Sequence, residues 1–322
     1  GRLDEAEALY KSVLKTDSTH FDAKQLLGEL RMRQGLYEDA IKLLRQAIAF
    51  NGKVPQVHLN LANAYLAQNA FAEAIASYDK VIALQPETLD AYARRGNAAK
   101  ALGQLDLALK SYDSALAIKP NIAEVLNNRA VTLLELGRPE EALASVLDAL
   151  SARPNYPEAY NNCGLIQTEL GQFTDAMASY DRAVALQPAY PAALYNRGIA
   201  LMQMKRPQDA LTAFIQSLVF APDNIDALNN AGVALTQLKR PAEAIERFEK
   251  LLSLQPNNAD ALNNCGAAFE ALSRPEEALK CYDRAIAIAP ELASAHCNRG
   301  MALAALHRFP EAIAAYDRAL DL

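Results

Sequence analysis

The chain has 322 residues, of which 51% are hydrophobic and 22% charged, and this composition excludes a predominantly disordered chain. A formal net charge of −6 argues against a nucleic-acid ligand, because binding to phosphates requires a clustered basic surface. No apolar run approaches the roughly 18 residues of a membrane span. The four cysteines show no Cys-x-x-Cys spacing, which predicts reduced thiols and a cytoplasmic location.

Proline recurs every 34 residues and defines a repeat in which Phe21 is position 1 and the proline is position 32. We expect residues 1–20 to be the second helix of a truncated repeat, 21–292 to form eight complete repeats and 293–322 a nearly complete ninth. The whole of 1–322 is then one repeat domain, and we expect it to be a fragment of a longer protein. The prolines are Pro86, Pro120, Pro154, Pro188, Pro222, Pro256 and Pro290.

Each repeat predicts two helices, A and B. Spacings such as Asn257-x-x-Asp260 predict that Asn121, Asn155, Asp223 and Asn257 cap A helices, with an acid near the positive end of the helix dipole. Helix A ends at position 15. Proline at position 17 begins several B helices, where it removes no hydrogen bond. Position 15 is Gly35, Asn69, Gly103, Gly137, Gly171, Lys205, Lys239, Ser273 or His307.

Small residues at positions 8 and 20, such as Gly198 and Ala210, predict a close approach of the two helices. Position 24 is large and mostly aromatic, as in Phe214, and is expected to fill the space between neighbouring repeats. This pattern resembles the tetratricopeptide repeat (TPR) family over the whole chain. The resemblance implies an all-α, right-handed superhelical solenoid of antiparallel helix pairs, with the A helices lining a concave groove.

Asparagine recurs at position 6 of helix A, although it is a poor helix former. Its amide has donors and an acceptor for both the C=O and the N–H of another peptide group. Since packed helices lie about 8–10 Å apart and an extended chain advances about 3.3 Å per residue, the row meets about every third residue of a bound peptide. These candidate peptide-binding residues are Asn60, Asn128, Asn162, Asn196, Asn230, Asn264 and Asn298; Leu26 and Arg94 interrupt the row.

Neighbouring positions of helix A add candidates to the same groove. Position 5 contributes amides and one aromatic residue, and position 9 is asparagine near the N-terminal end but apolar from Val131 onwards. For that apolar stripe, we favour packing against the next A helix over contact with a ligand. The further candidates for peptide binding are Asn127, Asn161, Tyr195, Asn229, Asn263, Arg94 and Asn97.

Within the TPR family, the asparagine row resembles that of the repeat arm of the O-GlcNAc transferases and their bacterial SPINDLY-like relatives. The resemblance implies a non-catalytic arm that recognises extended or disordered polypeptides for a glycosyltransferase domain elsewhere in the protein. Three alternatives stay open. The asparagines form a ladder that satisfies only itself, the chain is an adaptor that scaffolds a multiprotein assembly, or it self-associates through the uncapped ends of its repeats.

Aspartate at position 25 of one repeat accompanies arginine at position 7 of the next. Where the aspartate is absent, position 7 is Leu, Ala or Cys. We therefore predict four partly buried ion pairs between consecutive repeats. The pairs are Asp79 with Arg95, Asp113 with Arg129, Asp181 with Arg197, and Asp283 with Arg299.

No motif indicates catalysis, a cofactor or a metal. A Gly-rich phosphate loop, His-Glu-x-x-His and Gly-x-Ser-x-Gly are all missing from the sequence. The cluster of Cys281, His296, Cys297 and His307 has spacings that fit no zinc motif. We therefore expect no enzyme, no cofactor and no metal site, with polypeptides as the partners rather than nucleic acid or membrane.

Overall fold

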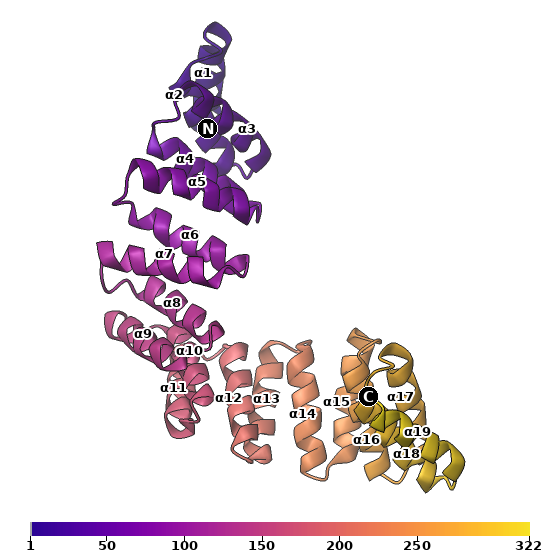
Figure 1. The fold of residues 1–322 in the computed structure, drawn as a ribbon. Helices are drawn as coiled ribbons and strands as arrows, with labels where there is room; N and C mark the ends of the chain where they lie inside the picture. Colours follow the sequence, from indigo (N-terminus) through magenta and orange to yellow (C-terminus); the bar gives the residue numbers. More distant parts are fainter. Residues whose placement is uncertain (1) are drawn as a thin grey trace. The chain divides into compact units, whose positions relative to one another are not determined.

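The computed structural model describes residues 2–322, with side chains from Asp4 onwards, as helices joined by short turns (Figure 1). This part of the chain contains no strand. The nineteen helices formed by residues 2–322 are α1 (Arg2–Thr16), α2 (Phe21–Arg33), α3 (Tyr37–Phe50), α4 (Pro55–Ala67), α5 (Phe71–Leu84), α6 (Leu89–Ala101), α7 (Leu105–Ile118), α8 (Ala123–Glu135), α9 (Pro139–Ala152), α10 (Pro157–Glu169), α11 (Phe173–Leu186), α12 (Pro191–Gln203), α13 (Pro207–Phe220), α14 (Ile225–Gln237), α15 (Pro241–Leu254), α16 (Ala259–Ala271), α17 (Pro275–Ile288), α18 (Ala293–Ala305) and α19 (Phe309–Leu320).

The chain divides into two compact units, Gly1–Asn155 and Tyr156–Leu322. In each unit, every even-numbered helix is a helix A that packs against the B helix after it, and each B helix packs against the A helix that follows it within the same unit. The predicted fold class, an all-α stack of antiparallel helix pairs with a 34-residue period, is confirmed. That residues 1–322 form a single domain stays a prediction.

The two helices of a repeat meet where a small residue faces a large one. Phe214 on α13 is fully buried, and a Cβ atom on Gly198 of α12 would clash with its ring. The same contact joins Gly232 to Phe248 and Gly266 to Tyr282. The position-24 side chain therefore lies against helix A of its own repeat, and in these repeats glycine at position 8 leaves the space that the ring occupies.

Position 15 ends every A helix from α2 to α18 in the left-handed conformation, with φ between 57° and 75°. The N–H of the next residue bonds back into the helix, as when Arg206 donates to the carbonyl of Leu201 at 2.9 Å. Glycine adopts this conformation freely, whereas an L-residue such as Lys239 pays about 1–2 kcal/mol for it. The predicted ends of the A helices are thus confirmed.

The predicted N-terminal caps are wrong by one residue. The A helices start one position later than the spacing suggested, so Asn258 rather than Asn257 caps α16 and accepts from the N–H of Ala261 at 2.9 Å. Asn224 caps α14 in the same way, in place of Asp223. Neither Asn121 nor Asn155 is a cap, because Ile122 and Tyr156 occupy the cap positions of α8 and α10 and make no side-chain bond there.

All four predicted ion pairs between consecutive repeats are present. The nitrogen–oxygen distances are 2.6 Å for Asp79–Arg95, 2.7 Å for Asp113–Arg129, 3.2 Å for Asp181–Arg197 and 2.6 Å for Asp283–Arg299. The arginine side chains are 11–32% exposed, but the aspartates are 51–60% exposed. Burial is therefore confined to the arginine side, and solvent screens each pair more than a buried ion pair.

We expect Lys239→Gly to raise the free energy of unfolding by about 0.5–1 kcal/mol, because removing the left-handed strain outweighs the extra backbone entropy of glycine. Gly137→Ala is the matched reverse change, and no atom lies within 4 Å of the added Cβ. It should destabilise by about 1 kcal/mol through backbone strain alone. Urea denaturation followed by circular dichroism measures both variants, and equal stability of the two would contradict this account.

A double-mutant cycle in urea should give a coupling of about 1 kcal/mol for Asp79 with Arg95 and less than about 0.5 kcal/mol for Asp181 with Arg197. Arg95 is the more buried arginine and its Nε also donates to Ser111 Oγ at 3.0 Å. In contrast, Arg197 Nε is buried and lies 3.2 Å from Asp181 Oδ1 without the geometry of a hydrogen bond. A larger coupling at Asp181 would show that distance and burial do not control these pairs.

Candidate functional site

The candidate residues at position 6 all lie at the same turn of successive A helices. Asn60 on α4 is buried, and the other asparagines of the row are half-buried. In the unit Tyr156–Leu322, the row runs through α10, α12, α14, α16 and α18 without interruption. In the other unit, Arg94 on α6 is exposed and separates Asn60 from Asn128 on α8.

In the unit Tyr156–Leu322, the position-6 amides are linked from repeat to repeat. Three of the Nδ2 atoms each donate to the position-5 asparagine of the preceding A helix, which lies 35 residues earlier in the chain. Asn162 on α10 accepts from Asn161 Nδ2 at 3.4 Å. The donor–acceptor distances are 3.0 Å for Asn196 to Asn161 Oδ1, 3.1 Å for Asn264 to Asn229 Oδ1 and 2.9 Å for Asn298 to Asn263 Oδ1. In this unit, the position-5 and position-6 candidates thus form a ladder in which each bond links one A helix to the preceding A helix.

These bonds leave part of each amide unused. Within residues 2–322, the Oδ1 atoms of Asn196, Asn264 and Asn298 accept no hydrogen bond, and each Nδ2 keeps a second hydrogen. An amide in this state still offers one donor and one acceptor. The inter-repeat bond fixes the plane of the amide while leaving it able to pair with a peptide group.

We call each bond between two successive A helices a rung of the ladder. The rung between α12 and α14 differs from the others, because position 5 of α12 is Tyr195. Asn230 Nδ2 donates to the Tyr195 hydroxyl at 3.1 Å and to the carbonyl of Asp226 at 2.9 Å. The tyrosine ring packs on Phe214, with 5.8 Å between the ring centroids. Burial and the nearby carboxylate of Asp226 raise the pKa of Tyr195, so its hydroxyl stays protonated at neutral pH.

In the unit Gly1–Asn155, the position-6 amide of α8 bonds to a position-9 residue and not to a position-5 residue. Since position 5 of α6 is Ala93, Asn128 Nδ2 donates instead to Oδ1 of Asn97 at 3.0 Å. Asn97 Oδ1 also accepts the buried Tyr112 hydroxyl at 2.8 Å. Tyr112 was not among the candidates predicted from the sequence, although the pairing of asparagine at position 9 with tyrosine at position 24 would have indicated it. Asn97 is therefore partly committed to holding its own repeat together.

The N-terminal part of the row differs further from a ladder. Asn60 Oδ1 accepts from Gln56 at 2.9 Å, while its buried Nδ2 has no partner among the described residues. Arg94 Nε lies 2.8 Å from both carboxylate oxygens of Asp90, which balances its charge. Asn60 and Arg94 are thus not joined to the other candidates by side-chain bonds of the ladder type.

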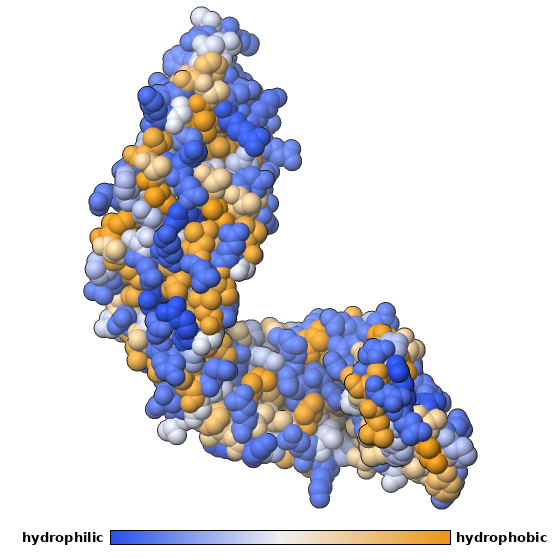
Figure 2. Space-filling model, viewed as in Figure 1, coloured by the Kyte–Doolittle hydropathy of each residue, from blue (hydrophilic) through white to orange (hydrophobic). Residues whose placement is uncertain are grey.

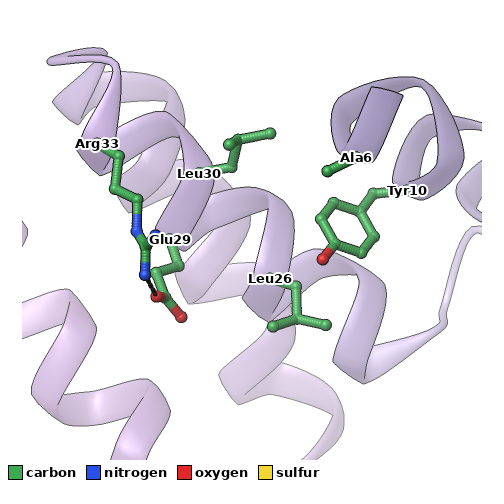
Figure 3. A pocket seen from close by; sticks show the side chains of 6 residues that line it. All are labelled: Ala6, Tyr10, Leu26, Glu29, Leu30 and Arg33. Atoms are coloured by element: carbon green, nitrogen blue, oxygen red, sulfur yellow. Dashed lines mark hydrogen bonds and ion pairs between the residues drawn. The ribbon is translucent and has the colours of Figure 1, made fainter. Parts of the chain in front are cut away.

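At the start of the row, an apolar residue replaces the amide. Figure 3 shows Leu26 of α2 facing a hollow that it shares with Ala6 and Tyr10 of α1. Glu29 and Arg33, which also line this hollow, form an ion pair at 2.8 Å. This hollow has no amide for pairing with a peptide backbone, in agreement with the interruption predicted at Leu26.

Apolar side chains also reach the surface away from the row, interspersed with polar ones on the face seen in Figure 2. Val219 and Phe220 at the end of α13 are 70% and 48% exposed and line an apolar hollow with Val184 and Leu194. Among residues 2–322, we find no helix with the length and apolar character that a bilayer-spanning segment needs.

No group of three metal-ligating side chains occurs in the described part of the chain. The His296 ring instead bonds the carbonyl of Pro290 at 2.9 Å. Cys163 and Cys265 at position 7 are buried, as expected for small apolar residues, and burial raises the pKa of the Cys163 thiol.

Family models cover most of the sequence. Models described as tetratricopeptide repeat match residues 1–58, 31–96, 123–156, 223–291 and 293–322, and a model described as TPR repeat matches 96–137 and 166–205. No curated protein matches the chain.

Solved structures with this fold include proteins of several kinds. PilW, a widely conserved type IV pilus biogenesis factor, is 28% identical over 63% of this chain and 94% of its own, with a TM-score of 0.58. A chain of the APC/C hetero-tetramer Cut9-Hcn1 is 16% identical over 93% of this chain but 59% of its own, with a TM-score of 0.60. A tetratricopeptide repeat protein from Parabacteroides merdae is 18% identical over 77% of this chain and 98% of its own, with a TM-score of 0.59.

Proposed function

Since the chain belongs to the tetratricopeptide repeat family, which uses stacked repeats as extended binding surfaces, we propose that it binds extended polypeptide segments along the asparagine ladder of α10–α18. The ladder of the unit Tyr156–Leu322 is the principal site in this proposal. The candidates Asn60, Arg94 and Asn97 contribute less, because their side chains are already engaged with neighbouring groups.

One observation carries the proposal, namely that three amides of the ladder are each held in place by a single bond from Nδ2. Asn196, Asn264 and Asn298 retain an acceptor oxygen and a donor hydrogen. Pairing with the N–H and C=O of a ligand peptide group then needs little further ordering of the side chain, which lowers the entropic cost of binding. Each such bond contributes about 0.5–1.5 kcal/mol. Contacts to the backbone tolerate many ligand sequences.

The biological setting we propose is the substrate-recognition arm of an O-GlcNAc-transferase-like protein. The support is the resemblance of the asparagine row to that of those enzymes. In this setting, the chain itself carries no catalytic group, and the chemistry takes place in a glycosyltransferase domain. Such a domain encoded in the same reading frame after Leu322 would support the proposal.

A second candidate is an adaptor that scaffolds a multiprotein assembly. The 28% identity to PilW, a type IV pilus biogenesis factor, favours this candidate. The adaptor would be recovered from cells in a stoichiometric complex without glycosyltransferase activity. Affinity purification of the full-length protein, followed by a transferase assay on the eluate, separates the two settings.

Replacing Asn196, Asn264 and Asn298 together by Ala should weaken the binding of unstructured peptides at least about tenfold, because three donor–acceptor pairs are lost. Helix content should be unchanged, since Ala is the better helix former. Fluorescence anisotropy on labelled peptides measures the affinity. The matched control is Asn257→Ala, the same substitution at an exposed turn residue outside the ladder. Equal affinities of the triple variant and the control would contradict the proposed function.

A further inference from the structure

The rung between α12 and α14 differs chemically from the other rungs of the ladder. Both hydrogens of Asn230 Nδ2 are engaged, one with the Tyr195 hydroxyl and one with the Asp226 carbonyl. Asn230 therefore offers a ligand only its Oδ1 acceptor. The Tyr195 hydroxyl accepts from Asn230 but has no acceptor for its own hydrogen among residues 2–322, so it provides the donor that Asn230 lacks.

The surroundings of this rung are apolar. Tyr195 packs on the buried ring of Phe214, and Ile199 lies one turn further along α12, on the same face of the helix. Val233 occupies the equivalent place on α14. All three of Tyr195, Ile199 and Val233 are half-buried members of the same hydrophobic cluster, so each keeps apolar surface in contact with solvent. Covering that surface stabilises a complex by about 25 cal/mol per Å².

We infer that Tyr195, with Ile199 and Val233, forms a subsite that selects an apolar side chain of the bound polypeptide. This inference rests on the proposed function and makes it more specific. The Tyr195 hydroxyl and Asn230 Oδ1 hold the peptide group next to that side chain. The ligand is therefore an extended segment with an aliphatic or aromatic residue at this point, rather than a uniformly polar chain.

An apolar ligand residue is expected at this rung because the side chains at the neighbouring rungs are polar. In α14 and α16, position 5 is Asn229 or Asn263, so a ligand side chain there meets amides. Only at α12, within the unit Tyr156–Leu322, does an aromatic side chain replace the position-5 amide and lie beside β-branched residues. Replacing Tyr195 by Asn should restore a rung of the common type without disturbing the fold.

The test compares two peptides of about twelve residues, enough to span about four rungs of extended chain. Both contain only Ser, Thr and Gly, except that one has a single central Leu. We expect the Leu to raise the affinity of the unmodified protein about fivefold to tenfold. Tyr195→Asn should abolish this gain, so that this variant binds the two peptides with affinities within about twofold of each other. Tyr195→Phe keeps the ring and should keep the gain.

A swap variant shows whether any loss comes from the subsite rather than from damage to the fold. In Tyr195→Asn with Asn229→Tyr, the aromatic residue moves to α14, beside Val233 and the buried Phe248, with Asn264 in the place of Asn230. The Leu gain should return in this variant. An undiminished gain in Tyr195→Asn, or no gain in the swap variant, would overturn the subsite while leaving the ladder proposal intact. Failure of the unmodified protein to bind either peptide would overturn both.

Discussion

The close contact between the two helices of one repeat determines where every other functional group lies. A ring at position 24 is buried directly over the glycine at position 8, as Phe214 is over Gly198. Only the face of helix A that carries the glycine lacks a bulky side chain. This contact therefore fixes which face of helix A is turned toward helix B. Positions 5, 6 and 9 are then directed away from helix B. The regular ladder is thus a consequence of how each hairpin packs.

Neighbouring repeats are joined by two kinds of polar contact in addition to the apolar core. The Asp–Arg pairs link helix B of one repeat to helix A of the next, and the amide ladder links successive A helices. The ion pairs have exposed carboxylates and are screened by solvent. The amides are more buried and their geometry is directional. Of the two contacts, the ladder is the one whose groups remain available to a ligand.

The periodicity of the sequence was sufficient to predict the helices, the positions at which the A helices end and the four ion pairs, because each depends on residues repeated at fixed spacing. The caps were misplaced since Asn257 and Asn258 are adjacent and composition alone does not distinguish them. The direction of each ladder bond was also beyond the sequence. Asn128 cannot donate to the side chain of Ala93 at position 5, and that Asn97 Oδ1 at position 9 lies within reach instead follows only from how the two helices pack.

A self-satisfied ladder and a peptide-binding ladder are compatible readings of the same amides. Asparagine has more hydrogen-bonding capacity than the stack of repeats uses, and the bond from Asn264 to Asn229 consumes one donor of the first and one acceptor of the second. The remaining groups are held at a fixed orientation by that bond. A side chain ordered in the free protein loses less entropy on binding than a mobile one. Under the proposed function, the structural role of the ladder therefore orients the amides for a ligand and does not compete with binding.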